Sequence, residues 1–300
     1  ADDDDGEAEG PGGYGMIFSA APLELGEGSH RGTRWSVIDV RQVIAVGLVL
    51  VGIFFDTAAA AGEDAANETT FVGYAYDRKT DVLLYTEFHS ESTRADGRVL
   101  AATYVAPNGE TIATYRAESS GDPLVPEVRF EDLRWGTSEG VRIEDGTIVL
   151  YRKRSASDER FDEKRPACAD RPVADAGLGL LIDRNWDRLL EGESVVAALL
   201  IPKRLRCLRF SLVKTDEWSL DGEPVVTIDM AFTNPLIRLL AGPLRFTYHR
   251  DDRVMVRFAG KSRLGDEAGD TQVVRVDFPM AERRERTADR RATRNGGSDG

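Results

Sequence analysis

Four turn dipeptides separate short alternating runs along this chain, and they limit its fold more than any other feature. They are Asp96-Gly97, Asn108-Gly109, Asp145-Gly146 and Asp221-Gly222. Both central residues of a type I′ turn need a positive φ, which Asp-Gly and Asn-Gly sequences tolerate well. Consecutive antiparallel strands are therefore predicted. No helical segments alternate with these runs, so the pattern argues against a parallel α/β sheet.

One segment, residues 174–192, departs from this pattern and predicts a helix. Asp175 is placed to cap its first turn, and Gly192 suits the left-handed position that ends a helix. Its apolar stripe at three- and four-residue steps needs a sheet to cover it. The stripe comprises Leu178, Leu181, Ile182, Trp186 and Leu189. The expected fold is mainly β, an antiparallel meander curled into an open or partly closed barrel around one central α-helix.

Composition divides the chain into four parts. Residues 1–61 are expected to form an acidic leader plus a secretory signal peptide, and residues 62–70 a linker. Residues 71–280 are expected to form a single β-rich domain. Residues 281–300 are rich in Arg and Gly and have no apolar period, so they are expected to be disordered.

The net charge of −13 is concentrated near the start of the chain. Residues 1–70 hold 13 acidic and 3 basic side chains, whereas residues 71–300 hold 39 and 36. The predicted folded part is therefore nearly neutral. This balance gives no electrostatic reason to expect a nucleic-acid partner.

The signal-peptide prediction rests on the order of three features. Arginines precede a 13-residue apolar run at 43–55, and small residues follow at 57–62. The run is too short to span a bilayer core of about 30 Å. Basic region, short apolar run and small-residue site are typical of a secretory signal peptide, so export to the periplasm with cleavage near Ala60 is expected. A buried helix or a retained N-terminal anchor is the alternative.

Export changes the interpretation of the two cysteines. In an oxidising compartment, Cys168 and Cys207 favour a disulfide, and two unpaired buried thiols are the alternative. The bridge would connect the segment before the helix to the strand after it. Neither cysteine lies in a C-x-x-C motif, so a redox or zinc role is not indicated.

No catalytic motif is present in the sequence, neither a G-x-S-x-G elbow nor an H-E-x-x-H motif nor a phosphate-binding glycine loop. Two groupings could bind a metal or supply a base: His89 with Glu87 and Glu91, and His249 with Asp251 and Asp252. A wet strand face and a solvated turn are the simpler interpretations. No catalytic residue, metal or cofactor is predicted.

Carboxylates also step by four along the predicted helix, at Asp183, Asp187 and Glu191. Such spacing could serve acid–base chemistry. Arg184 and Arg188 lie beside them at helical spacing, which favours a salt-bridged, solvated face instead.

A second apolar segment, residues 234–243, predicts a very short helix with an Asn cap, Pro at its first position and Gly at its end. It carries too many aliphatic side chains for a surface loop. It would either plug the mouth of the curled sheet or form an apolar lip over a ligand cavity. Trp186 is either a core anchor or part of that cavity. The candidate cavity residues are Trp186, Leu236, Ile237, Leu239 and Leu240.

Several motifs resemble an uncharacterised family of exported proteobacterial β-rich proteins, over about residues 70–280. They are Gly73-Tyr74-Ala75-Tyr76-Asp77, Leu84-Tyr85-Thr86-Glu87-Phe88-His89, Tyr104-Val105-Ala106-Pro107-Asn108-Gly109, Asp175-Ala176-Gly177, Asn185-Trp186-Asp187 and Asn234-Pro235-Leu236. At the level of architecture alone, a meander curled round a helix is similar to the periplasmic lipoprotein-carrier fold. That resemblance implies an apolar concavity that holds acyl chains.

Three functions are compatible with these observations. The first is a periplasmic, non-enzymatic binding protein for an apolar ligand, a lipid or acyl chain or a lipoprotein, because the concave surface exceeds what one helix can cover. The alternative is a structural or envelope-associated interaction protein with a packed core, peripheral to the envelope. The third is a metal-dependent or hydrolytic enzyme that uses His89 or His249. The sequence leaves the oligomeric state open.

Overall fold

The computed structural model describes residues 67–94, 97–119, 121–266 and 269–287. The chain divides into two compact units, Ala1–Ala59 and Ala60–Gly300, and every described residue belongs to the second. The predicted leader, signal peptide and cleavage site therefore lie outside the described residues. None of the described helices is long and apolar enough to cross a membrane.

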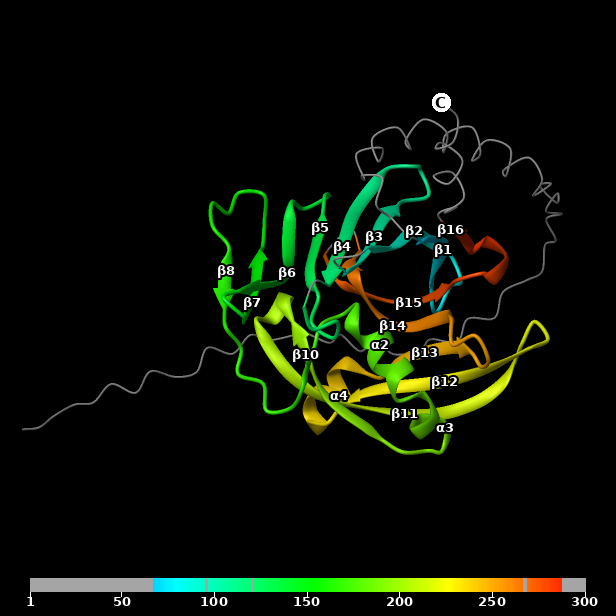
Figure 1. Ribbon diagram of the computed structural model, residues 1–300. Helices are drawn as coiled ribbons and strands as arrows, with labels where there is room; N and C mark the ends of the chain where they lie inside the picture. Colours follow the sequence, from blue (N-terminus) through cyan, green and yellow to red (C-terminus); the bar gives the residue numbers. More distant parts are fainter. Residues whose placement is uncertain (1–66, 95–96, 120, 267–268, 288–300) are drawn as a thin grey trace, which may run out of the picture. The chain divides into compact units, whose positions relative to one another are not determined.

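One sheet contains all the described strands, and it is antiparallel except for the pair β9–β10 (Figure 1). Its spatial order is β8-β7-β6-β5-β4-β3-β2-β1-β15-β14-β13-β12-β11-β10-β9, and β16 pairs with β1 beside this path. β1 therefore joins two meanders, one running from β2 to β8 and the other returning from β15 to β9. The strands are β1 (Asn67–Asp77), β2 (Leu83–Arg94), β3 (Gly97–Val105), β4 (Thr111–Ser119), β5 (Glu127–Asp132), β6 (Thr137–Glu144), β7 (Thr147–Lys153), β8 (Asp162–Lys164), β9 (Pro172–Val173), β10 (Val195–Ile201), β11 (Arg206–Leu220), β12 (Glu223–Phe232), β13 (Leu244–His249), β14 (Met255–Gly265), β15 (Thr271–Asp277) and β16 (Arg284–Thr287).

The turn dipeptides adopt the predicted backbone where they are described. Both residues have positive φ at Asp145-Gly146 (49° and 74°) and at Asp221-Gly222 (53° and 94°), as a type I′ turn requires. At Asn108-Gly109 only the glycine does, with φ of 87°. Asp96 lies outside the described residues. The antiparallel meander predicted from these dipeptides is confirmed.

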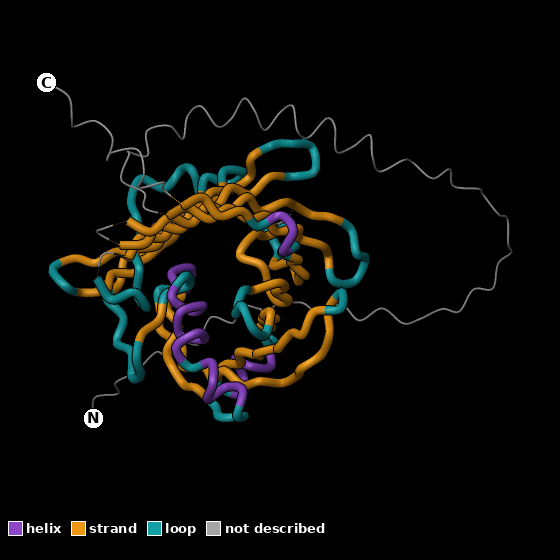
Figure 2. Tube along the Cα trace, turned by 45° about the vertical axis from the view of Figure 1, so that its right-hand side comes forward, coloured by secondary structure: helices purple, strands orange, loops and turns teal. Residues whose placement is uncertain are grey.

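The sheet curls without closing into a barrel (Figure 2). Its edges are β8 and β9, and no described hydrogen-bond ladder joins them. A short 3-10 helix, η2 (Pro202–Arg204), lies beside the first of these edges, where Arg152 on β7 donates to the Lys203 carbonyl oxygen at 2.6 Å. Both edge strands are very short, which limits the unpaired backbone that another chain could bind.

The expected single central helix is not confirmed, because two short helices form instead. They are α2 (Gly177–Arg184) and α3 (Trp186–Leu190), and Asn185 separates them with φ of −114°. Its side-chain Nδ2 donates to the Leu181 carbonyl oxygen at 2.8 Å, so the side chain competes with the helical backbone pattern. The predicted apolar stripe is nevertheless buried throughout. Gly192 follows α3 with φ of 86°, the left-handed conformation expected there.

Asp175 does not cap α2. The N-cap is Ala176, which has no side-chain hydrogen bond, and the Asp175 carboxylate accepts from Arg263 on β14 at 2.8 Å. The start of α2 is instead placed by close packing. A Cβ atom on Gly177 would overlap the Leu124 carbonyl group, so only glycine fits this approach.

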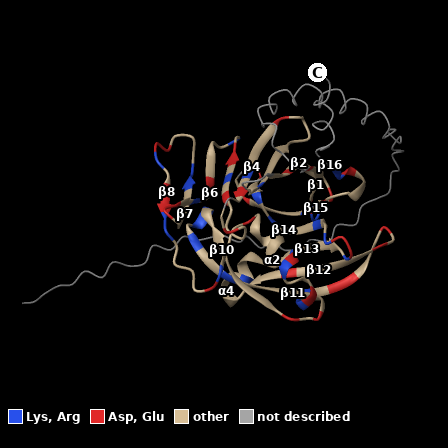
Figure 3. Cartoon of the chain, viewed as in Figure 1, with Lys and Arg blue, Asp and Glu red and all other residues tan. Residues whose placement is uncertain are grey.

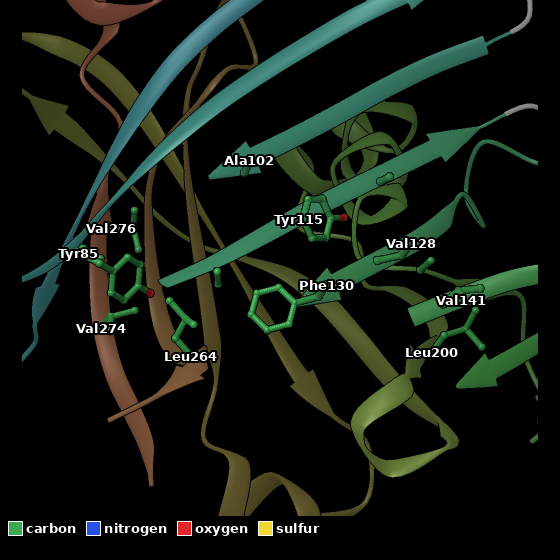
Figure 4. Close-up of a cluster of buried hydrophobic side chains, with 14 of the residues drawn as sticks. Tyr85, Ala102, Tyr115, Val128, Phe130, Val141, Leu200, Leu264, Val274 and Val276 are labelled. Carbon is green, nitrogen blue, oxygen red and sulfur yellow. The ribbon is translucent and has the colours of Figure 1, made fainter. Parts of the chain in front are cut away.

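The core consists of two hydrophobic clusters on the inner face of the sheet. The first gathers side chains mainly of β1 to β7, β14 and β15, and it runs from Tyr85 and Val276 at one end to Val141 and Leu200, the latter on β10, at the other (Figure 4). The second lies between the helices α2 and α3 and strands β10 to β13. Met255 and Phe258 pack against both clusters, so they mark the boundary between the two halves.

The predicted disulfide is present. Cys168 and Cys207 are bonded, with their Cα atoms 5.6 Å apart and a separation of 39 positions in sequence. Cys168 precedes β9 and Cys207 lies on β11, so the bridge connects the segment before the helices to the strand after them, as predicted.

Four strands do not follow from the sequence pattern. β5 has no turn dipeptide before it, and the short strands β8 and β9 lie in or beside a polar segment that favours a long loop. β16 contradicts the prediction of disorder for residues 281–300, because its residues 284–287 pair with residues 67–70 of β1, which belong to the expected linker. Strand pairing here needs backbone only, so an Arg-rich segment without an apolar period can still form it.

Candidate binding site on the inner face of the sheet

Glu87 and His89 lie on the inner face of β2, and not on the wet face that the sequence suggests. The His89 Nε2 atom is 2.8 Å from Glu87 Oε2, and Glu87 is only 8% exposed. The predicted alternation along β2 is present. The assignment of faces is wrong, because Phe88 on the opposite face is 42% exposed. Glu91 is not part of this pair, since its carboxylate pairs with Arg98 at 2.7 Å.

Two phenylalanines hold the His89 ring in place. Phe71, its cross-strand partner on β1, stacks on it with centroids 4.6 Å apart and planes 4° apart. Phe278 meets the ring edge-on at 5.8 Å. The Nδ1 atom is buried and has no hydrogen-bond partner among the described residues. A carboxylate accepts only, so Nε2 carries the proton in this contact and Nδ1 is left without a partner among those residues.

Two tyrosines extend the polar group beyond this pair. Tyr104 lies opposite Glu87 on β3, and burial together with the Glu87 carboxylate raises the pKa of its hydroxyl well above the ordinary value. Burial and Glu87 raise the pKa of the Tyr85 hydroxyl as well. Tyr85 also shares a 2.8 Å hydrogen bond with Ser262. Both phenols are therefore neutral hydrogen-bonding groups on an otherwise apolar wall.

A second polar cluster surrounds Arg263 on β14. Its guanidinium lies over the rings of Tyr115 and Phe130, at 5.4 and 5.1 Å, and it pairs with Asp175 at 2.8 Å and Glu139 at 3.7 Å. Burial lowers the pKa of Arg263, but the Asp175 and Glu139 carboxylates outweigh this and the net pKa is raised. These contacts connect β14 to β6 and to the start of α2, so the cluster fixes the relative positions of helix and sheet.

The helices cover only part of the inner face. α2 and α3 pack on the core cluster of β10 to β13, whereas the inward side chains of β1 to β3 belong to the other cluster, which contains no residue of either helix. Phe71, Leu100 and Tyr104 there are only partly buried. We call the side chains here that neither helix covers the uncovered inner face, although the Arg283 guanidinium lies 5.1 Å from the centre of the Phe71 ring. The uncovered inner face comprises Phe71, Glu87, His89, Leu100 and Tyr104.

The structure does not bring the five predicted cavity residues together. Trp186 is 3% exposed and packs edge-on against Tyr248 at 5.8 Å, so it is a core anchor. Ile237 packs against the same core cluster. Leu236, Leu239 and Leu240 instead point to solvent from helix α4 (Pro235–Ala241), which therefore does not plug the sheet.

The predicted local structure of α4 is confirmed. Asn234 Oδ1 accepts from the backbone N–H groups of Leu236 and Ile237, at 3.0 and 3.2 Å. Pro235 is the first residue, and Gly242 follows the helix with φ of 68°.

The remaining polar candidates make local polar contacts. His249, in the predicted hairpin turn, lies 3.4 Å from Glu223 and 3.2 Å from Asp252. Arg253, rather than an arginine of the helices, pairs with Asp183 at 3.4 Å and Asp187 at 3.7 Å. No group of three or more His, Cys, Asp or Glu side chains in the described residues could hold a metal ion.

Two hollows lie on the outer face of the sheet, over strands β3 to β7. Their volumes are about 430 and 350 Å³, and Arg116 and Arg129 line both. A repeated Arg-x-Glu pattern, which the sequence contains but no expectation above uses, forms ion pairs here: Arg116 pairs with Glu118, Arg129 with Glu131 and Arg142 with Glu144. Charges on this face therefore neutralise one another locally (Figure 3). A charged ligand gains little from such a surface.

The fold defines a mainly β protein with one large, curled and open sheet. No family model matches the sequence, and no curated protein does. Among solved structures, the chain is similar to a β-barrel-like protein of a domain of unknown function, DUF1849, from Brucella abortus. The two are 10% identical, the match covers 75% of this chain and 99% of that chain, and the TM-score is 0.47. A similarity of this strength carries no inference about activity or ligand.

Proposed function

We propose that this protein is an exported, non-enzymatic binding protein that holds an apolar ligand on the uncovered inner face. The observation that carries the proposal is the incomplete burial of Phe71, Leu100 and Tyr104 on a concave sheet. Apolar side chains on an inner face gain free energy when a ligand removes them from water, by about 25 cal/mol per Å². A lipid or acyl chain, free or carried by a lipoprotein, matches this chemistry.

The polar groups on the same face indicate how such a ligand would be oriented. Ligand sites are typically apolar with a few fixed polar groups. Glu87 fixes the His89 ring, and the buried Nδ1 atom of His89 lacks a partner among the described residues. An unpaired buried polar atom costs about 1–3 kcal/mol, which a polar group of the ligand would recover after displacing Phe71 or Phe278, the two rings that pack against His89. We expect an amphipathic ligand whose polar group reaches His89.

The cellular setting belongs to the same proposal. A disulfide is typical of exported proteins, and Cys168–Cys207 agrees with export to the periplasm through the sequence signal near Ala60. The resemblance to exported proteobacterial proteins and to the lipoprotein-carrier architecture points the same way. A catalytic role for His89 is the weaker proposal, because no metal-ligand cluster accompanies it in the described residues.

A matched pair of variants tests the ligand-binding site. Leu100 and Val99 are neighbours on β3 that face opposite sides of the sheet. We expect Leu100→Gln to weaken binding of the fluorescent probe N-phenyl-1-naphthylamine and its displacement by palmitate about tenfold, because one buried aliphatic contact is lost. Val99→Gln should bind as the wild type does. Equal binding by both variants, with intact folding shown by circular dichroism, would exclude the inner face as the site.

A further inference from the structure

Helix α4 presents an apolar surface that nothing in the described chain covers. Leu236 is 66% exposed, Leu239 79% and Leu240 53%. No residue of α4 is buried, although Ile237 and Ala241 pack against the core beneath it. Isolated exposed leucines are common, but three on one seven-residue helix are a concentrated apolar patch. We call Leu236, Leu239 and Leu240 the leucine patch.

Contacts at both ends of α4 hold the helix in place, and so they hold the leucine patch in its exposed position. The Asn234 side chain caps its start and Gly242 ends it. Lys261 on β14 donates from Nζ to the Leu240 carbonyl oxygen at 2.6 Å, which secures the last turn to the sheet. The leucines are therefore held outward by the fold, rather than exposed by a loose loop.

Basic side chains flank the leucine patch without carboxylate partners. Among the described residues, no carboxylate pairs with Arg238 on α4 or with Lys261 beside it. The start of β11 also lies near α4. β11 runs antiparallel to β12, the strand before α4, and the Thr233 N–H at the end of β12 donates to the Arg209 carbonyl oxygen at 3.1 Å. Figure 3 shows basic residues beside α4.

The carboxylates near this end of the sheet are already neutralised. Asp229 pairs with Arg245 at 2.8 Å, and Asp170 pairs with Arg209 at 3.1 Å. The leucine patch is thus bordered by net positive charge, although the chain as a whole is acidic. This separation of charge disfavours a basic partner and fits an anionic one.

We infer that α4 docks on an anionic phospholipid surface, with the leucine patch entering the boundary between headgroups and acyl chains. Leucines on one side and Lys or Arg beside them are the features of interfacial helices. Basic residues near an anionic leaflet add attraction that falls off within about 10 Å at 0.1 M salt. Binding of this kind is reversible and places the protein at the membrane, where an apolar ligand is found.

Vesicle co-sedimentation of the mature chain tests this inference. We expect binding to vesicles of phosphatidylcholine and phosphatidylglycerol (3:1), and at least tenfold weaker binding to phosphatidylcholine alone or in 0.5 M NaCl. Replacing the leucine patch together (Leu236→Ser, Leu239→Ser, Leu240→Ser) should reduce binding at least tenfold. The matched control replaces three exposed apolar residues elsewhere, Val82→Ser, Leu133→Ser and Ile143→Ser.

Charge is tested separately in the same assay. Arg238→Gln, which leaves the Lys261 contact with α4 intact, should weaken binding to the anionic vesicles about fivefold and leave the residual binding to phosphatidylcholine unchanged. Arg78→Gln with Lys79→Gln, in the exposed turn between β1 and β2, is the control. Binding that is equal on neutral and anionic vesicles, or unaffected by either α4 variant, would overturn the inference.

A site-specific probe shows whether α4 itself enters the lipid. Both native cysteines are in the disulfide, so Leu239→Cys provides one labelling site for an environment-sensitive NBD dye. The NBD emission should rise and shift to the blue on anionic vesicles, whereas dye at Leu133→Cys should not respond. An equal response at both sites would contradict docking through α4. Probe binding by the inner face is unaffected in either case, so the two proposals fail independently.

Discussion

At the scale of single residues, neighbours in one strand have opposite environments, and sequence alternation does not say which side is inside. Glu87 and His89 are on the inner face and Phe88 is on the outer one. Because Glu87 is a carboxylate and Phe88 is apolar, the sequence suggests the reverse assignment, with Phe88 inside and Glu87 in water. The sheet reverses it because Glu87 gains His89 as a partner at 2.8 Å, which offsets part of the cost of burial.

Two glycines in α2 provide a residue-scale prediction with an internal control. Gly177→Ala should destabilise the protein by about 1–3 kcal/mol, because the new Cβ overlaps the Leu124 carbonyl group and the backbone must shift. A Cβ atom on Gly179 would meet nothing within 4 Å, so Gly179→Ala should stabilise by about 0.5–1 kcal/mol. Urea unfolding of both variants measures the difference. Equal effects would contradict the packing described at the start of α2.

Glu139 gives a pH-dependent prediction. Burial raises the pKa of its carboxyl above the ordinary value, against the opposing charges of Arg263 and Lys203. The folded state therefore holds this proton more tightly than the unfolded state. Its contribution to stability is complete below the ordinary carboxyl pKa and declines as pH rises through the raised value.

Glu139→Gln removes this titration while keeping the shape of the side chain. The free energy of unfolding of the variant, relative to the wild type, should therefore increase as pH rises from the ordinary carboxyl pKa towards neutrality. Denaturant unfolding at several pH values measures it, with Glu118→Gln on the outer face as the control for loss of a charge. A difference that stays constant with pH, or falls as pH rises, would refute the assigned environment.

At the scale of elements, the sequence predicts the turns and helix ends that depend only on neighbouring residues. The hairpins at Asp145-Gly146 and Asp221-Gly222 and the cap of α4 at Asn234 follow from backbone preference alone, and the structure contains them. The break at Asn185 and the loss of the Asp175 cap do not follow. Asp175 does not cap the helix because its carboxylate binds Arg263, which is 88 residues away in the sequence.

The disulfide also acts at the scale of elements. It closes a loop of 39 residues that contains β9, α2, α3 and β10, so its loss should lower the free energy of unfolding by about 4 kcal/mol in the chain-entropy model. Cys168→Ser with Cys207→Ser and reduction of the wild type should give the same loss. Reductant should have no effect on the double variant. A change below about 1 kcal/mol would show that this segment holds its place without the bridge.

At the scale of the whole described unit, two meanders are joined by one long-range pairing. β1 pairs with β15 across about 200 residues, and this contact determines which faces of the two meanders meet. No turn signal specifies such a pairing, so the open sheet, the two core clusters and the uncovered inner face could not be placed from the sequence. The sequence predicts an apolar concavity, but it does not predict that Phe71, Leu100 and Tyr104 are the partly buried side chains of the inner face.

Native mass spectrometry of the protein purified from its host cells, followed by organic extraction, is the direct test of ligand binding at the inner face. We expect a co-purifying apolar species on the wild type and on Val99→Gln that is largely lost from Leu100→Gln. A wild-type protein that carries no such species, and takes none up from added lipid, would contradict binding at the inner face.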